Sequence, residues 1–429
     1  MQFYYKNTAL IDSSSLSKYL SKLETYCVRL QNVVFGGGYD ELEGSINLPS
    51  DENLFNDVCA LVKKIETKTL QYIIVVGIGG SNLGTKAIYD ALFGYYDVLD
   101  CERFPKIIFL DTQDPDVLMK IGRLIEKLSH KDQIVINAIS KSGSTTETAA
   151  NLEVVSSTLF HKFGNISDRF VFTTDEESNM YNIAKKIHIK TLVIPKKIGG
   201  RYSVLSSVGL FPLMLVGLDV IKLRQGAENV RKMCVNSSML VNPSAISSAL
   251  LYHYYLCGKN INDNFIFLPQ LESLGKWYRQ LMGESIGKNG KGITPTISIG
   301  STDLHSVGQL YLGGPKDKIT SFIYSQEVDQ GISVPNNPRF GLVPEIEGKK
   351  IYEIINAIVS GTKIAYQKQK LPFVEIVLDG IREEEIGAFM QFKMIEMMYL
   401  AKLLKVNAFD QPHVELYKIE TKKILEGRV

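Results

Sequence analysis

Residues 71–79, QYIIVVGIG, place a run of apolar and β-branched side chains directly before a glycine-rich segment. Such a run is typical of a parallel strand buried on both faces, because a strand of that kind carries little polar alternation. Similar runs follow at 106–112, 133–140, 169–175 and 191–195, with stretches typical of helices between them at 82–95, 115–128, 145–162 and 177–187. This alternation predicts a doubly wound α/β domain with a parallel sheet.

A second alternating series begins further along the chain. Strands are expected at 264–269, 294–299, 320–326 and 373–380, and helices at 203–218, 244–257, 272–287, 302–313, 350–367 and 383–405. A chain of 429 residues is also too long for one core. The predicted organisation is a helical N-terminal segment (1–68), a first α/β domain (69–220), a second α/β domain (221–405) and a C-terminal helical segment (406–429).

The composition argues against several classes of function. The 48 basic and 46 acidic residues give a net charge of +2, which does not suit a nucleic-acid binder that works by bulk charge. No apolar run is long enough to span a membrane and no signal peptide is visible, so a cytoplasmic location is expected. The five cysteines and six histidines lack the spacing of a disulfide framework or a metal site, so no metal is expected.

The glycine-rich segment Gly77–Gly84 follows the first strand and opens a helix. Its glycines let the backbone approach a ligand closely, and its amides face an anion from a helix N-terminus. Two nucleotide-binding patterns fit this segment poorly. The dinucleotide-binding pattern G-x-G-x-x-G, started at Gly77, reaches Asn82 where its third glycine should stand. In the pattern of an ATP-binding P-loop, the lysine comes one place late, at Lys86. A purely structural tight turn is the alternative.

A second loop, Ser140–Thr148, also follows an apolar strand and holds six hydroxyl side chains in nine residues. One hydroxyl is enough to cap a helix, so the excess suits a phosphate dianion bound by hydroxyls, free amides and the positive helix end. The alternative is a Ser/Thr-rich turn with a capping box between Ser144 and Glu147. Two anion-binding loops at neighbouring strand ends favour a phosphorylated ligand.

Together with three further motifs, these loops resemble the glucose-6-phosphate isomerase family, whose domains are of the sugar isomerase (SIS) type. The glycine-rich loop lies within VGIGGSNLG (76–84). The further motifs are IGGRYSVLSSVGL (198–210), the pair ESIGKNGKGITP and STDLHS (284–306), which resembles the short bacterial form, and AFDQPHVELYK (408–418). All of them occur in the order expected for the family. The resemblance implies two SIS-type domains in a cytoplasmic homodimer with a shared active site. It also implies interconversion of glucose 6-phosphate and fructose 6-phosphate by ring opening and a cis-enediol, without cofactor, nucleic acid or membrane.

The catalytic base of this family lies in a Glu-Ser-x-Gly-Lys segment, which occurs here at both Glu272 and Glu284. Only Glu284 follows the aromatic pair and the Arg-Gln of the short bacterial enzymes and keeps their short spacing to STDLHS. On one continuous helix the two carboxylates would lie about 120° apart, on different faces. We therefore expect Glu284 to be the base and Glu272 to be a charge at a helix N-terminus.

The resemblance also assigns the remaining roles. His305 and Lys418 match the residues that open the sugar ring, Arg201 matches the arginine that stabilises the enediolate, and His305 is the expected donor to a partner chain's site. His413 stands where the family usually has Gly or Ala, which would allow a tighter approach near Lys418. The residues expected to bind substrate are Gly80, Ser81, Ser140, Lys141, Ser142, Ser144, Thr145, Thr148, Gly200, Gln280 and Gln411.

Two other functions are compatible with parts of this pattern. A bifunctional phosphoglucose/phosphomannose isomerase is usually shorter and lacks the Phe-Asp-Gln-Pro-x-Val-Glu segment found here. A non-catalytic sugar-phosphate sensor needs the phosphate loop but not Glu284, His305 and Lys418. The presence of all three residues favours an enzyme.

Overall fold

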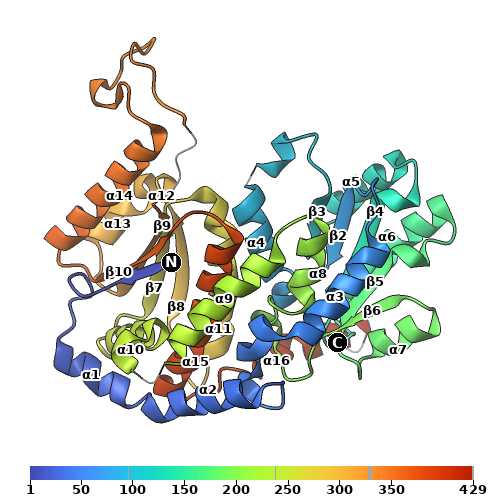
Figure 1. Cartoon of the computed structure of the whole chain (residues 1–429), viewed down its shortest axis with the longest axis horizontal. Helices are drawn as coiled ribbons and strands as arrows, with labels where there is room; N and C mark the ends of the chain where they lie inside the picture. Colours follow the sequence, from blue (N-terminus) through green and yellow to red (C-terminus); the bar gives the residue numbers. More distant parts are fainter. Residues whose placement is uncertain (95, 237, 327–330, 428–429) are drawn as a thin grey trace.

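Within residues 1–94, 96–236, 238–326 and 331–427, which the computed structural model describes, two five-stranded sheets are flanked by helices (Figure 1). The last two residues of the predicted C-terminal segment lie outside this part. The first sheet has the order β3-β2-β4-β5-β6, and every pairing in it is parallel. Its strands are β2 (Tyr72–Val76), β3 (Lys106–Leu110), β4 (Ile134–Ile139), β5 (Phe170–Thr174) and β6 (Lys190–Val193). They agree closely with the predicted runs.

The second sheet has the order β1-β10-β9-β7-β8, in which β1 alone pairs antiparallel. Its strands are β1 (Gln2–Tyr4), β7 (Ile261–Ile266), β8 (Thr294–Ile299), β9 (Lys318–Ser325) and β10 (Phe373–Leu378). The sequence did not predict β1, because three residues show no period and the N-terminal segment as a whole has a helical pattern. The strand predicted at 264–269 begins three residues earlier, since its polar start is buried by cross-strand hydrogen bonds such as Thr296 Oγ1 to Asp263 Oδ1 (2.7 Å).

The strand order of both sheets creates a switch point. In the first sheet β2 lies between β3 and β4, and in the second sheet β7 lies between β8 and β9. The order in which the chain adds strands therefore reverses direction between β2 and β4 and between β7 and β9. Ligands of open α/β sheets bind outside the carboxyl ends of the strands at such points.

The helices account for most of the remaining chain. The first half contains α1 (Ser13–Ser21), α2 (Glu24–Gly36), α3 (Glu52–Ile65), α4 (Leu83–Phe93), α5 (Pro115–Lys127), α6 (Thr146–Phe163), α7 (Asn179–Lys186) and α8 (Ser207–Leu215). The second half contains α9 (Val220–Cys234), α10 (Pro243–Leu256), α11 (Glu272–Ile286), α12 (Thr302–Ser306), α13 (Gly308–Gly313), α14 (Ile351–Lys368), α15 (Glu383–Leu404) and α16 (Val414–Leu425). Sequence reasoning missed α9 and merged α12 with α13.

One large core lies between the two sheets. Alternate residues of β2 face opposite ways, so Ile73 and Val75 join the core shared with α3, α4, α8 and the helices of the second sheet, whereas Ile74 and Val76 pack on α5 and α6. A third cluster of phenylalanines covers the outer face of the second sheet beneath α14. The domain limits drawn from the sequence stay a prediction, because this core is continuous across them.

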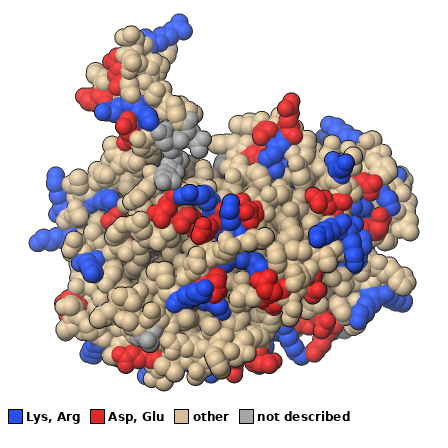
Figure 2. All heavy atoms as spheres, viewed as in Figure 1, with Lys and Arg blue, Asp and Glu red and all other residues tan. Residues whose placement is uncertain are grey.

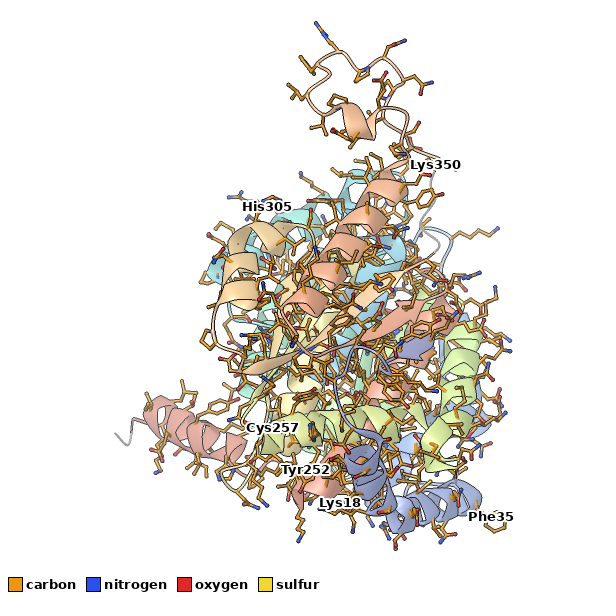
Figure 3. The ribbon with its side chains drawn as sticks, turned by 90° about the vertical axis from the view of Figure 1, so that its left-hand side faces the viewer. Lys18, Phe35, Tyr252, Cys257, His305 and Lys350 are labelled. Carbon is orange, nitrogen blue, oxygen red and sulfur yellow. The ribbon has the colours of Figure 1, made fainter. Side chains whose placement is uncertain are left out.

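Two segments extend from the body. Residues 331–350, here called the arm, project beyond α14 in Figure 1 and expose apolar side chains, among them Phe340 (78%) and Leu342 (86%). No residue of α16 is buried, and Figure 3 shows this helix, which ends in the grey trace, standing away from the body. Figure 2 shows positive and negative side chains interspersed over one face, in keeping with the near-zero net charge. In the described part of the chain, no helix is long and apolar enough to cross a membrane.

Candidate active site

The two predicted anion-binding loops adjoin at the switch point of the first sheet. Gly77 follows β2 directly, and a Cβ added to it would lie 2.9 Å from the backbone oxygen of Ile139, the last residue of β4. Glycine at this position therefore lets the two strand ends stay close. From here the chain passes through a short 3-10 helix, η2 (Gly79–Ser81), into α4.

The hydroxyl loop after β4 is ordered by its own side chains. The Oγ of Ser140 lies 3.0 Å from Oγ1 of Thr145 and accepts a hydrogen bond from the amide of Gly143 (3.1 Å). Thr145 is the N-cap of α6, and its side chain makes no capping hydrogen bond. The alternative interpretation, a capping box between Ser144 and Glu147, does not hold, because the helix begins one residue later. Backbone amides at the start of α6 stay available to an anion.

Two further features of this loop suit a phosphate. The hydroxyl of Thr148 is buried and has no hydrogen-bond partner among the described residues, a condition that folded proteins rarely tolerate. Burial lowers the pKa of Lys141, which by itself disfavours its charged form, and the carboxylate of Asp175 acts against this effect. Ser142 and Ser144 are exposed, so their hydroxyls can reach a ligand from solvent.

The second glycine motif docks onto the first. A Cβ added to Gly80 would lie 2.2 Å from the carbonyl carbon of Gly200, and one added to Gly79 would lie 2.9 Å from Nε2 of Gln280. The backbones of residues 80 and 200 are therefore in direct contact, which only glycine permits at position 80. This contact brings Arg201, in the 3-10 helix η6 (Gly200–Tyr202), and Gln280, on α11, to the end of β2.

Arg201 is the buried centre of the resulting cluster. A guanidinium has five N–H donors, and all five of these are engaged. Nε donates to Oγ of Ser285 (3.0 Å), Nη1 donates to Oε2 of Glu284 (3.1 Å) and Oε1 of Gln411 (2.7 Å), and Nη2 donates to the backbone oxygens of Ala408 (2.6 Å) and Asp410 (3.0 Å).

Glu284 lies at the partly exposed edge of this cluster, near the end of α11. Its Oε2 faces Arg201, and its Oε1 accepts a hydrogen bond from Nε2 of Gln280 (3.0 Å), one helical turn earlier. Glu272 lies in the first turn of the same helix and pairs with Lys276 at 2.7 Å. The structure thus places Glu284, and not its near-duplicate Glu272, beside the arginine. A carboxylate held between an amide and a fixed cation can accept a proton from a bound substrate.

The structure does not bring His305 and Lys418 into this cluster. His305 lies on α12 and is exposed, and its side chain makes no hydrogen bond with the described residues; Figure 3 labels it on the surface. Lys418 lies on the exposed α16 and pairs with Glu415 at 2.7 Å. His413, which replaces the usual glycine or alanine, precedes α16 with a φ of −74°, so a side chain causes no backbone strain there.

Sequence reasoning missed several residues that hold the cluster in place. Tyr202 places its hydroxyl 2.9 Å from Oγ of Ser285, and burial raises the pKa of this tyrosine. Lys288 forms an ion pair with Asp410 at 2.9 Å. All four residues lie inside or beside the motifs quoted above, and this adjacency was the only signal that could have found them.

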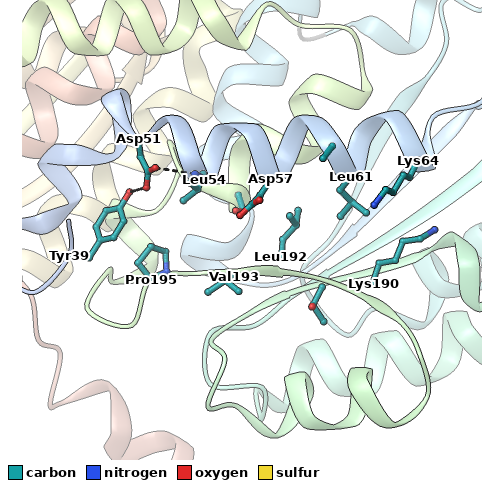
Figure 4. A pocket seen from close by; sticks show the side chains of 13 residues that line it. Tyr39, Asp51, Leu54, Asp57, Leu61, Lys64, Lys190, Leu192, Val193 and Pro195 are labelled. Atoms are coloured by element: carbon teal, nitrogen blue, oxygen red, sulfur yellow. Dashed lines mark hydrogen bonds between the residues drawn. The ribbon is translucent and has the colours of Figure 1, made fainter. Parts of the chain in front are cut away.

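A separate cavity of about 540 Å³ lies between α3 and β6 (Figure 4). On its wall, the hydroxyl of Tyr39 donates to Asp51 (2.6 Å), which also caps α3 by accepting from the amide of Leu54 (3.0 Å). None of the predicted site residues lines this cavity. Among the described residues, no group of three or more His, Cys, Asp or Glu side chains could hold a metal ion.

Several known proteins are similar to this chain in sequence or in fold. A family model described as phosphoglucose isomerase matches residues 56–335. The glucose-6-phosphate isomerase of Methanocaldococcus jannaschii is 34% identical over 358 residues, covering 82% of each chain, and that of Leptospira biflexa serovar Patoc is 34% identical over 420 residues, covering 95% of this chain and 91% of that protein. A solved structure of a hypothetical protein from Thermus thermophilus superposes with a TM-score of 0.86 at 27% identity over 99% of each chain. A glucose-6-phosphate isomerase from Chlamydia trachomatis shares the fold, with a TM-score of 0.83 at 20% identity over 99% of this chain and 88% of that chain.

Proposed function

The chain belongs to the phosphoglucose isomerase family and interconverts glucose 6-phosphate and fructose 6-phosphate, and we propose that the cluster around Arg201 and the two loops of the first sheet form its active site. The reaction belongs to glycolysis and gluconeogenesis. The observation that carries the proposal is the 3.1 Å contact between Glu284 and the buried Arg201, next to the glycine loop that adjoins the hydroxyl loop.

The isomerisation moves a proton between C1 and C2 of the open sugar. It needs a carboxylate base and a positive charge beside the oxygen that becomes negative in the enediolate. In our proposal Glu284 is the base, with its carboxylate oriented by Gln280. Arg201 stabilises the enediolate, because a guanidinium keeps its charge at any working pH and this one is buried and held by five hydrogen bonds.

The loops of the first sheet bind the phosphate group of the substrate in this proposal. The hydroxyl loop presents side chains, free amides and the N-terminus of α6 to the phosphate group. The residues proposed to bind the phosphate are Ser140, Lys141, Ser142, Ser144, Thr145 and Thr148, and those proposed to contact the sugar are Gly80, Ser81, Gly200, Gln280 and Gln411.

We further propose that His305 and Lys418 open the sugar ring in a homodimer with a shared active site. A single chain leaves both side chains exposed and apart from Glu284, which suits a site completed by a second copy. The exposed apolar side chains of the arm and of α16 support such a contact surface. A cytoplasmic location is also proposed, since all five cysteines carry free thiols.

The two glutamates of α11 provide the test. Purified protein should form fructose 6-phosphate from glucose 6-phosphate without added metal. Glu284→Gln should lower kcat about 10³-fold with little change in KM, because it removes the general base and keeps the shape of the side chain. Glu272→Gln is the matched control and should stay within about twofold of the parent enzyme. An active Glu284→Gln and an inactive Glu272→Gln would refute the assignment. A parallel assay with mannose 6-phosphate tests the bifunctional alternative.

A further inference from the structure

Lys288 lies just beyond the end of α11, and its side chain is only 6% exposed. Its ammonium pairs with Asp410 (2.9 Å) and donates to the backbone oxygens of Ser285 (3.2 Å) and Asn407. A lysine has three donors, and here each has an acceptor. Lysine is seldom buried unless it is paired, so this arrangement fixes both the lysine and the groups around it.

Two of these three partners, Asn407 and Asp410, lie in a single segment, residues 407–411, which we call the C-terminal loop. It joins α15 to α16 and carries Gln411. Arg201 also holds this loop, through the backbone oxygens of Ala408 and Asp410 and through the side chain of Gln411. Two buried cations therefore bind one short segment, and only Arg201 contacts Glu284.

We propose that Lys288 is a positioning residue whose ion pair with Asp410 holds the C-terminal loop against the active site, so that Gln411 meets Arg201 and α16 starts from a fixed point. The inference rests on the proposed active site, since the place of Gln411 matters only if that residue contacts substrate. Lys288 acts through the loop: it makes no hydrogen bond to Glu284 among the described residues.

The surroundings of this ion pair indicate what its loss would do. Asp410 is 50% exposed and its other carboxylate oxygen accepts from Nδ2 of Asn407 (2.9 Å), so the outer side of the loop faces water. Without Lys288 the loop keeps its bonds to Arg201, and we expect it to shift rather than unfold. A displacement of about 1 Å in a substrate-positioning group can cost about 100-fold in rate.

The charge on Lys288 makes the effect depend on pH. Burial lowers the pKa of Lys288 from its usual value; Arg201 acts in the same direction, whereas the carboxylates of Asp410 and Glu284 oppose it. The ion pair exists while the lysine is protonated, so it is lost as the pH rises through this lowered pKa. An arginine at the same place would keep its charge.

Kinetics of the full-length enzyme test the proposal. Lys288→Met should lower kcat/KM about 10- to 100-fold, and Asp410→Asn, on the exposed side of the pair, should give a smaller loss. Combining the two should add little to Lys288→Met alone, because both remove one interaction. Lys288→Arg should recover activity to within about threefold and move the alkaline fall of kcat/KM to higher pH. Lys291→Met is the matched control, since Lys291 donates to Leu404 (2.8 Å), outside the C-terminal loop, and it should stay within about twofold.

Inhibitor binding separates positioning from general damage to the fold. Inorganic phosphate should inhibit Lys288→Met as it inhibits the parent enzyme, because the ammonium of Lys288 bonds to Asp410, Ser285 and Asn407 and to no residue of the hydroxyl loop. An aldonic acid phosphate, whose planar carboxylate resembles the enediolate, should bind about tenfold more weakly.

Two results would overturn the proposal: normal kcat/KM in both Lys288→Met and Asp410→Asn, or equal weakening of both inhibitors. An active Glu284→Gln would instead show that the proposed active site itself is wrong. An inactive Glu284→Gln beside normal kcat/KM in both Lys288→Met and Asp410→Asn would refute only the positioning role.

Discussion

The two sheets share one arrangement of parallel strands but contribute to the proposed site in different ways. In the first sheet, the loops after β2 and β4 flank the switch point and lie where strand order predicts a ligand. In the second sheet, the β7/β9 switch point carries no predicted site residue, and β9 leads toward the arm. Glu284 comes instead from the far end of α11, which must return toward the amino ends of the strands to begin β8. The same topology can therefore present either of its edges to a substrate.

Two regions of the proposed site also differ in the groups they offer. The loops after β2 and β4 supply hydroxyls, amides and a helix N-terminus, and groups of this kind bind an anion in the ground state and the transition state alike. The region around Arg201, formed by η6, the end of α11 and residues 407–411, supplies a carboxylate and buried cations, which suit a charge that develops during reaction. We therefore expect changes in the first region to act mainly on KM, changes in the second to act mainly on kcat, and a break between them to affect both.

The contact between Gly80 and Gly200 joins the two regions, and breaking it should have the largest effect. Gly80→Ala places a Cβ 2.2 Å from the carbonyl carbon of Gly200, where backbone must move. Steady-state kinetics should show kcat/KM reduced at least about 100-fold, with a lower melting temperature. Gly122→Ala, in open space on α5, is the control and should leave kinetics unchanged while adding about 0.5–1 kcal/mol of stability. A fully active Gly80→Ala would mean that the regions do not form one site.

A change confined to the hydroxyl loop should have an intermediate effect. Thr145→Val removes the hydroxyl that lies 3.0 Å from Ser140 at the start of α6. We expect KM for glucose 6-phosphate and the inhibition constant of inorganic phosphate to rise about tenfold, with kcat within about threefold. The reason is that the lost hydrogen bond would stabilise the bound substrate and the transition state equally. Thr158→Val, on the exposed face of the same helix, controls for the substitution. A fall in kcat at unchanged KM would contradict the division between the regions.

A change in the core behind α11 should have the smallest effect on activity. The hydroxyl of Tyr278 donates to Oε2 of Glu396 (3.0 Å), which is fully buried and paired with Lys393 (2.9 Å). Tyr278→Phe should lower the free energy of unfolding by about 1–2 kcal/mol, measured with denaturant, and keep kcat within about twofold. Tyr255→Phe, half-buried and without a side-chain hydrogen bond to the described residues, is the comparison. Loss of activity without loss of stability would show that this core takes part in catalysis.

The sequence predicted the first sheet well because its strands are buried on both faces and therefore read as continuous apolar runs. It misplaced the start of β7, where Asn262, Asp263 and Asn264 are buried by partners on other strands. No local pattern reveals such partners. It missed α9, whose helical spacing lies at the predicted domain boundary, and β1, which gains its structure only by pairing with β10.

The motifs indicated the residues of the proposed site but not their contacts. They indicated Arg201 and Glu284, but 83 positions separate them, and only the fold shows that they touch. Lys288 and Asp410 are charged residues near helix ends. From sequence alone, such residues are predicted to be exposed to solvent. His305 and Lys418 show the opposite case. Their motifs are clear in the sequence, but both side chains lie at the surface of a single chain.

The fully engaged guanidinium of Arg201 has a consequence for affinity. A substrate oxygen that bonds to it must displace an acceptor that the protein already supplies, and Glu284 and Gln411 are the side chains within its reach at the open edge. Binding at this cation is therefore an exchange of one oxygen for another, and its free energy is a difference between two nearly equal sets of hydrogen bonds. Affinity gained there will be small, whereas selectivity can be high, because a misplaced oxygen would break an existing bond without replacing it.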